Sequence, residues 1–383
     1  MVKDKIVVYG LSTEGYSLAC QIATKGADVH IIDESSSSAM SLKPETAKTY
    51  PSVASLQGDE PLLLMKPIDV AISEADYLFF TPRIRNVGDD LKADINLKFK
   101  NAVTPLKKGS SVVYCIATGF GGNNENMSLL KHVTGFEAGK SISYFYFPLN
   151  DVNNTPQIIG SLKKVDDKKL SLLLTTGKDV KKFVEISSAE YIHGINTIKR
   201  FSSQCSILEI CKFANSNTKS DKTFDDFKDM YLDDMITGLF DLRSLGSSFD
   251  GTAQTLMYLI NGSIKGITGY IKRLIDSIRT TLKKNDLKAS KIKIVLSWTL
   301  DKNEMRSDKI QMLKSLSIKL RDYIGDVETA EGRADIFPGD KTTIFVACSR
   351  IDYKKIKEIE DDQDIFIIKA NPLCEVENKG KII

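Results

Sequence analysis

Short apolar runs alternate along the chain with stretches in which apolar residues recur at helical spacing. The first run, KIVVY at residues 5–9, leads into Gly10 and then into a helical pattern in which Leu18, Ala19, Ile22 and Ala23 share one apolar face. A second apolar run at 27–32 stops at Asp33. A strand, a glycine turn, a helix, a strand and an acid in this order are typical of the opening of a Rossmann unit.

Three domains follow from the rest of the pattern. An α/β domain is predicted over 1–187, a helical domain over 188–286 and a second, smaller α/β domain over 287–383, where KIKIVLS restarts the strand pattern. The fold class is therefore α/β, with two Rossmann-like, doubly wound parallel sheets joined by a helical central domain that includes a long connecting helix.

Individual elements can be assigned within these domains. After the first two strands, we predict strands at 70–72, 77–80, 111–117, 343–347 and 365–368. Helices are predicted near 166–174, 188–212, 241–283 and 310–324. The polar stretch 215–226 is predicted to be a loop.

Composition narrows the class of protein. The 383 residues are 42% hydrophobic and 27% charged, as in a folded globular chain, and no apolar run approaches the roughly 20 residues that cross a bilayer. We expect a cytoplasmic protein without a membrane partner. The net charge of +3 comes from interspersed charges, which favours no nucleic-acid partner. Six scattered cysteines without a C-x-x-C pair indicate neither a zinc site nor a disulfide framework.

The first turn carries the candidate cofactor chemistry. Its sequence, GLSTEG, has Gly10 and Gly15 of the G-x-G-x-x-G dinucleotide fingerprint but Ser12 at the middle glycine. Asp33 stands where a carboxylate accepts hydrogen bonds from a ribose diol, which favours NAD over NADP. Glu14 would repel a bound diphosphate. NAD binding and a Rossmann scaffold without a ligand therefore both remain open.

The order of these parts resembles the UDP-glucose/GDP-mannose (nucleotide-sugar) dehydrogenase family over nearly the whole chain. The similar stretches are VYGLSTEG, EADYLFFTP at 74–82, LKKGSSVV at 106–113, PLNDVNNTPQIIG at 148–160 and KIKIVLSWTLDKNEMRSD at 291–308. The resemblance implies an NAD domain, a central helix that mediates a homodimer, and a C-terminal domain for the nucleotide sugar. It also implies oxidation of the sugar C6 alcohol to a carboxylate through a cysteine thiolate.

The catalytic positions of that family carry other residues here. Alignment at Asp241 places Thr237 at the thiol and Phe240 at the lysine. In the central helix, His193 falls at a second lysine, and Glu209 matches a further glutamate. His193 is either a base or a packing residue.

Arg306 matches a C-terminal arginine that contacts the cofactor in the family. A surface ion pair with Glu304 or Asp308 is the alternative for this arginine.

Three functions follow from these substitutions. The first is a degenerate relative that lacks thiol-dependent oxidation and binds a dinucleotide or a nucleotide sugar. The second is an active NAD-dependent oxidoreductase with altered chemistry, in which His193 is the base. The third is a structural or interaction scaffold that binds no ligand.

Overall fold

A computed structural model describes residues 4–36, 38–59, 61–85, 90–149, 157–162, 166–177, 181–214, 225–249, 254–330, 342–358 and 365–378. These residues form two compact units. Unit 1 consists of Met1–Asn196, Ser244–Asp250 and Asp301–Ser307, and unit 2 consists of Thr197–Arg243, Gly251–Leu300 and Asp308–Ile383. The division into three domains at residues 187 and 286 stays a prediction.

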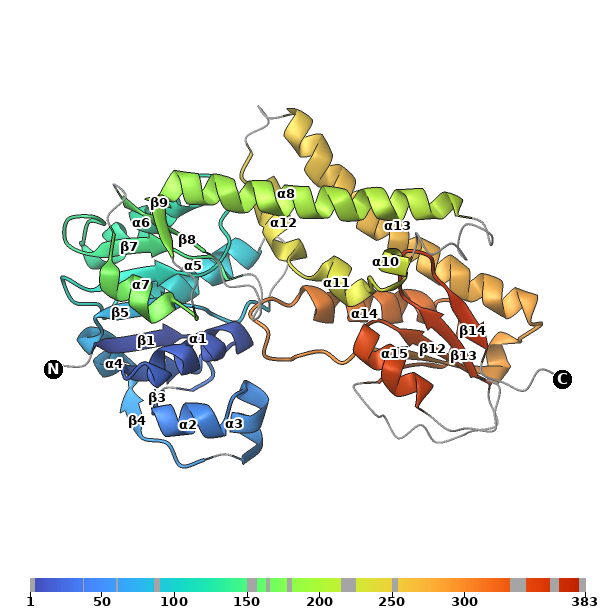
Figure 1. The fold of residues 1–383 in the computed structure, drawn as a ribbon, viewed down its shortest axis with the longest axis horizontal. Coiled ribbons are helices and arrows are strands. Elements are labelled where there is room, and N and C mark those ends of the chain that lie inside the picture. Colours follow the sequence, from blue (N-terminus) through green and yellow to red (C-terminus); the bar gives the residue numbers. More distant parts are fainter. Residues whose placement is uncertain are drawn as a thin grey trace. The chain divides into compact units, whose positions relative to one another are not determined.

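Unit 1 is built on a nine-stranded sheet in the order β4-β3-β2-β1-β5-β6-β7-β8-β9 (Figure 1). The strands are β1 Lys5–Tyr9, β2 Asp28–Ile32, β3 Ser38–Leu42, β4 Met65–Pro67, β5 Tyr77–Phe80, β6 Ser111–Tyr114, β7 Ser143–Tyr146, β8 Ile158–Ser161 and β9 Lys182–Glu185. The central strands β2, β1, β5, β6 and β7 pair in parallel, whereas β3 pairs antiparallel with β2 and β4, and β8 with β7. A parallel Rossmann-like core is therefore extended by antiparallel strands.

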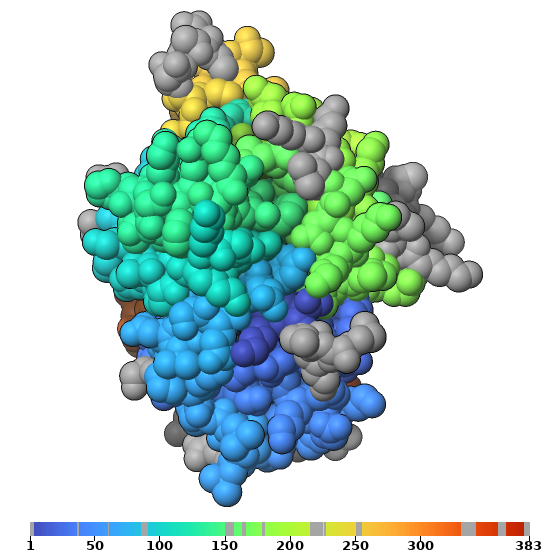
Figure 2. All heavy atoms as spheres, turned by 90° about the vertical axis from the view of Figure 1, so that its left-hand side faces the viewer, coloured from blue at the N-terminus to red at the C-terminus, as the bar shows by residue number. Residues whose placement is uncertain are grey.

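Helices connect these strands. They are α1 Thr13–Thr24, α2 Pro44–Thr49, α3 Val53–Asp59, α4 Ile68–Glu74, α5 Asp90–Val103, α6 Gly122–Thr134 and α7 Lys168–Leu174. The predicted apolar face of α1 is buried, with Leu18, Ala19 and Ile22 among its buried residues. Figure 2 shows the surface of this unit, on which the blue residues of its first half and the cyan to green residues of its second half gather in separate areas, as the strand order requires.

The strand predicted at 70–72 is wrong, because these residues lie in α4. Pro67 precedes the helix, and Asp69 in its first turn suits the positive end of the helix dipole. Ala71 and Ile72 are buried while Val70 is 41% exposed, which is the burial of one face of a helix. A short apolar run does not distinguish a strand from a buried helical turn.

Unit 2 contains a five-stranded sheet in the order β11-β10-β12-β13-β14. Its strands are β10 Ile292–Ser297, β11 Val327–Ala330, β12 Thr342–Ala347, β13 Ile365–Lys369 and β14 Val376–Asn378, all parallel except β14. Its helices include α10 Asp225–Lys228, α11 Leu232–Ile236, α13 Gln254–Lys284, α14 Asp308–Arg321 and α15 Arg350–Lys357. Short 3-10 turns lie at Cys211–Phe213 and Ala289–Lys291.

Two helices cross the boundary between the units. They are the long helix α8, Ile186–Ile210, and α12, Leu239–Gly246. The predicted α/β class with two sheets and a long helix is confirmed. The predicted polar loop at 215–226 lies almost entirely outside the described residues.

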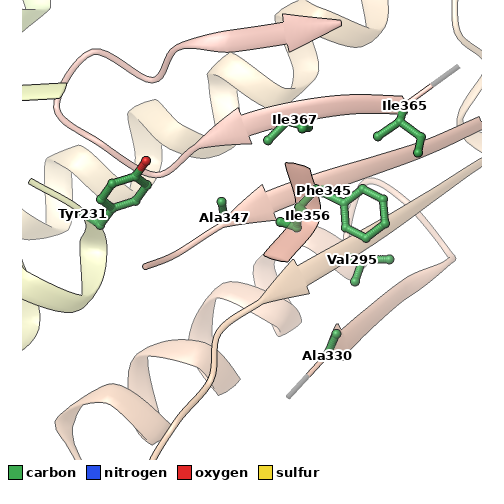
Figure 3. Packing of buried hydrophobic residues seen from close by; sticks show 8 residues of the cluster. All are labelled: Tyr231, Val295, Ala330, Phe345, Ala347, Ile356, Ile365 and Ile367. Atoms are coloured by element: carbon green, nitrogen blue, oxygen red, sulfur yellow. The ribbon is translucent and has the colours of Figure 1, made fainter. Parts of the chain in front are cut away.

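The core of unit 2 lies against its sheet. Apolar side chains from β10, β11, β12 and β13 pack together with residues of α15 and with Tyr231 (Figure 3). This cluster consists of Tyr231, Val295, Ala330, Phe345, Ala347, Ile356, Ile365 and Ile367. Strands that are covered in this way read as continuous apolar runs, which explains why the sequence pattern located β10, β12 and β13. No strand was predicted at β11, whose two central residues are exposed.

Candidate functional site

The glycines of the first turn are required by packing. Gly10 has a φ of +116°, and a Cβ on it would lie 2.2 Å from the carbonyl oxygen of Thr81. A Cβ on Gly15 would lie 2.3 Å from the Thr81 hydroxyl oxygen. Both glycines therefore let α1 and β1 approach the end of β5, whether or not a ligand binds. Their predicted role in cofactor binding stays a prediction.

Ser12 caps α1. Its hydroxyl oxygen accepts a hydrogen bond from the Gly15 N–H at 3.1 Å, and the hydroxyl donates to the Thr81 carbonyl at 2.9 Å. The residue is fully buried. The serine in place of the middle glycine thus stabilises the helix N-terminus from within.

The N-terminus of α1 contacts a segment from the other end of the sequence. Asp301–Ser307 (the 301–307 segment) belongs to unit 1, although it follows β10 in the chain. The Thr13 N–H donates to the Asn303 carbonyl at 2.7 Å, and the Thr13 hydroxyl donates to the Asp301 carboxylate at 2.5 Å. Two donors of the first helical turn are therefore bonded to this segment.

Glu14 is a buried carboxylate in the same turn. The Met305 N–H donates to its Oε2 at 2.7 Å. Burial raises the pKa of Glu14 above its usual value, while the positive charge of Arg306 acts in the opposite direction. The carboxylate is thus held by an N–H donor and a cation of its own unit.

Arg306 is buried and donates from Nη2 to the Leu149 carbonyl at 2.6 Å. Its charge interacts with Glu14 inside unit 1. This position differs from the surface ion pair that was the alternative for Arg306. A contact with a cofactor stays a prediction.

Asp33 follows β2, as predicted, but its carboxylate is engaged. Arg83 forms an ion pair with it at 2.7 Å, and the Ser35 N–H donates to it at 3.0 Å. The Arg83 guanidinium also lies 3.4 Å from the Asn303 side-chain oxygen. The carboxylate expected at a ribose diol is therefore bonded to a loop of its own unit.

The predicted catalytic positions are divided between the two units. His193 is a partly buried residue of α8 in unit 1. In unit 2, the Thr237 hydroxyl donates to the Asp233 carbonyl at 2.8 Å, and Glu209 pairs with Lys212 at 2.5 Å. Thr237 and Glu209 each bond within their own segment, and their catalytic roles stay predictions.

Burial disfavours the thiolate form of four of the cysteines. Burial raises the pKa of Cys20 to about 11 and also raises the pKa of the Cys115, Cys205 and Cys348 thiols. Cys211 and Cys374 are buried. A nucleophilic thiol needs the opposite change, because the thiolate is the reactive form.

Sequence reasoning missed a polar cluster in unit 2. Trp298 donates from its indole N–H to the Asp233 carboxylate at 2.8 Å, and Lys309 lies 3.1 Å from the same carboxylate. The Asp308 carboxylate accepts from the Phe240 N–H at 2.7 Å and lies 3.6 Å from the Arg243 guanidinium. This cluster lies where β10 ends and α14 begins, the edge at which open α/β sheets bind ligands.

A second carboxylate that sequence reasoning missed lies at the same end of this sheet. Asp352 is fully buried in α15. It accepts from the Thr299 N–H at 3.1 Å, from the Thr299 hydroxyl at 2.5 Å and from the Ser349 hydroxyl. A Ser-x-x-Asp pattern directly after the apolar run 343–347 is a sequence signal for such a capped helix.

Among the residues that the structure describes, no group of three or more His, Cys, Asp or Glu side chains is placed to hold a metal ion. Within the same residues, no helix has the length and apolar character that crossing a membrane requires.

Known proteins were then compared with the chain. No protein-family model and no curated protein sequence matches it. The UDP-D-ManNAc dehydrogenase of Pyrococcus horikoshii is similar in structure, with a TM-score of 0.65, 13% identity, and coverage of 90% of this chain and 88% of that one. The fold is that of the nucleotide-sugar dehydrogenases.

Two more structures agree with this fold. A UDP-glucose dehydrogenase from Pyrobaculum islandicum has a TM-score of 0.64 at 12% identity, with coverage of 97% of this chain and 94% of that one. The UDP-N-acetyl-mannosamine dehydrogenase of Staphylococcus aureus has a TM-score of 0.54 at 13% identity, with coverage of 94% and 85%. The resemblance noted in the sequence is confirmed for the nucleotide-sugar dehydrogenase fold.

Proposed function

We propose that this chain is a nucleotide-sugar dehydrogenase-like protein that binds a nucleotide sugar and does not oxidise it through a thiol. The proposal rests on the low nucleophilicity of the candidate thiols and of the Thr237 hydroxyl. Burial raises the pKa of the Cys20, Cys115, Cys205 and Cys348 thiols, and the Thr237 hydroxyl is bonded to a backbone carbonyl. A thiohemiacetal with the sugar aldehyde requires a thiolate, which none of these groups supplies at neutral pH.

The arrangement of α1 argues against NAD as a resident cofactor. A dinucleotide diphosphate needs N–H groups at the helix N-terminus that point to the ligand. In this chain the Thr13 N–H is bonded to Asn303 and the Gly15 N–H to Ser12. The Glu14 carboxylate would also oppose the diphosphate charge. These residues do not fit the cofactor in this arrangement, so no hydride transfer is assigned to the chain.

The polar cluster of unit 2 is our candidate for the nucleotide-sugar site. Arg243 is exposed and adjoins Asp308, and Lys309 is in the first turn of α14. Arg200 of α8 lies near Gly238, since a Cβ on that glycine would be 3.5 Å from the Arg200 Nη1. Arg243 and Lys309 are paired with the Asp308 and Asp233 carboxylates, and the diphosphate of a nucleotide sugar would replace these carboxylates as the partner of both cations.

The expected homodimer is part of the same proposal. Tyr191 and Ile195 lie four residues apart in α8 and are 57% and 62% exposed. Residues at this spacing share one face of a helix. An exposed apolar face on the long helix is consistent with contact to a second copy of the chain.

Calorimetric titration tests the proposal. The purified chain is titrated separately with NAD, UDP-glucose, UDP-N-acetylglucosamine and GDP-mannose, and the absorbance of NADH is followed on mixtures. We expect one nucleotide sugar to bind, no NADH to form, and Arg243→Ala to weaken binding roughly tenfold. Arg279→Ala is the matched control, because Arg279 is an exposed arginine of α13 in the same unit.

The other outcomes would assign the other functions. Formation of NADH that is lost in His193→Ala would establish an active oxidoreductase with His193 as base. Absence of binding to every nucleotide sugar would favour a scaffold without a ligand.

A further inference from the structure

N–H groups of the first turn of α1 are bonded within unit 1. The first four N–H groups of a helix have no partner inside the helix, which makes them an anion site. Here the Thr13 N–H donates to the Asn303 carbonyl and the Gly15 N–H donates to the Ser12 hydroxyl. A diphosphate would have to displace these bonds.

The 301–307 segment is also fixed to the loops at the carboxyl end of the sheet. The Ile84 N–H, after β5, donates to the Met305 carbonyl at 2.7 Å. Arg85 donates to the Lys302 carbonyl at 2.7 Å, and Arg306 donates to Leu149, after β7, at 2.6 Å. The segment is therefore held by the loops that follow β5 and β7 as well as by α1. In open α/β sheets, ligands bind at this edge.

We propose that the 301–307 segment is the resident intrachain ligand of the α1 N-terminus, and that the Glu14 and Asp301 carboxylates take the electrostatic role of a dinucleotide's phosphates. The chemistry matches on both sides of the contact. Anionic groups face the positive end of a helix, N–H groups donate to oxygen, and the Arg306 guanidinium compensates the buried charge of Glu14. A bound diphosphate is stabilised by the same three interactions.

This inference goes beyond the proposed function. Binding of a nucleotide sugar to unit 2 does not depend on it, and a closed α1 N-terminus is compatible with a chain that binds no sugar. A closed α1 N-terminus excludes dinucleotides and other diphosphates from unit 1.

Amide hydrogen exchange of the full chain tests whether the 301–307 segment occupies the α1 N-terminus. Exchange is measured by mass spectrometry on peptides that cover residues 10–17 and 299–306. The wild-type chain is measured alone, with NAD and with inorganic pyrophosphate. We expect both peptides to exchange slowly and at the same rate in all three samples. Slower exchange in residues 10–17 when NAD or pyrophosphate is present would overturn the proposal.

Variants test the coupling of the two peptides. In Glu14→Ala, exchange should rise by about tenfold in both peptides, because the Met305 N–H loses a charged acceptor. Asp301→Asn, which keeps the side-chain shape, should raise exchange in residues 10–17 by a smaller factor. This variant replaces Glu14→Ala in the test if Glu14→Ala does not fold. Glu125→Ala, at an exposed acid of α6, should change neither peptide. A rise confined to residues 10–17 in Glu14→Ala would show that the segment is not held by this contact.

Discussion

The two sheets differ in how their first strand is connected to the following helix. In unit 1, residues 10–12 alone join β1 to α1, and a Cβ on Gly10 would collide with the end of β5. In unit 2, residues 298–307 join β10 to α14 and contain no glycine. A short connection needs glycine because the helix and the strand approach each other closely. A long connection can change direction over several residues, so none of them has to be glycine.

Both sheets nevertheless place a buried carboxylate at their carboxyl ends. Glu14 interacts with the cation of Arg306 and accepts the Met305 N–H, whereas Asp352 accepts from the Thr299 and Ser349 hydroxyls and an N–H. The first carboxylate is balanced by charge and the second by hydrogen bonds. Carboxylates buried at the same end of two sheets can thus be compensated by different chemistry.

The largest effect is expected at the short connection. Gly10→Ala places a methyl group 2.2 Å from a backbone oxygen at a φ of +116°, and neither atom can move aside cheaply. We expect unit 1 to lose at least about 4 kcal/mol of stability. Gly58→Ala, in the open part of α3, is the control and should be neutral or slightly stabilising. Thermal unfolding by circular dichroism distinguishes the two, and equal melting temperatures would refute the packing argument.

Removing the hydrogen-bonded carboxylate should have the next largest effect. Asp352→Ala removes the buried carboxylate that accepts from the N–H and the hydroxyl of Thr299, which costs about 2 kcal/mol. The fluorescence of Trp298, the one tryptophan in the sequence and a buried residue of unit 2, reports this loss during urea unfolding. Asp276→Ala, at an exposed acid of α13, is the control. An unchanged midpoint for Asp352→Ala would mean that these bonds do not stabilise the sheet.

The charge-balanced carboxylate should respond to pH. The folded chain raises the pKa of Glu14 above its usual 4.5, so the stability that the protonated group provides is complete below pH 4.5 and is lost as the pH rises through the raised value. Glu14→Gln has no such dependence. The melting temperature of Glu14→Gln minus that of the wild type should therefore increase from pH 4 to pH 7.

The matched control for this measurement is Glu125→Gln, in which the altered side chain is 62% exposed. Its melting temperature should follow the wild type at every pH. If the difference for Glu14→Gln instead falls as the pH rises, Arg306 and the Met305 N–H outweigh burial at Glu14.

The smallest effect is expected at the thiols, whose reactivity should be equally low in the two units. Because burial raises the pKa of Cys20 to about 11 and also that of Cys205, few thiolates exist at pH 7 in either unit. Iodoacetamide should label both cysteines no faster than a free cysteine in a peptide, with a rate at Cys20 that increases up to about pH 11. Mass spectrometry of the alkylated chain measures this. A cysteine that reacts quickly at neutral pH would reopen the thiol chemistry.

The strands of the fold were predictable where burial is continuous. The runs 5–9, 77–80 and 365–368 lie in β1, β5 and β13, because covered parallel strands are apolar at successive positions. The antiparallel strand β3, Ser38–Leu42, was not predicted, since three of its five residues are only partly buried and its sequence begins in a serine cluster. A strand that is only partly buried has a weak sequence signal.

The candidate site was predictable in position but not in its contacts. Gly10 and Ser12 lie in the turn between β1 and α1, and Asp33 directly follows β2, where the sequence pattern placed them. The bonds from this turn to Asp301, Asn303 and Met305 join residues nearly 300 positions apart, and no local pattern encodes such a contact. Glu14 was noted as an acid that would repel a diphosphate, but its partners required the fold.

The position of the 301–307 segment also has a consequence for synthesis. The chain leaves unit 2 after Leu300, completes unit 1 with seven residues and returns to unit 2 at Asp308. Domains generally fold as units during translation, beginning with the N-terminal one. The first sheet of this protein can form early on the ribosome, but the N-terminus of α1 stays uncovered until residue 307 has emerged. Premature termination before that point would release a Rossmann unit with its anion-binding turn exposed.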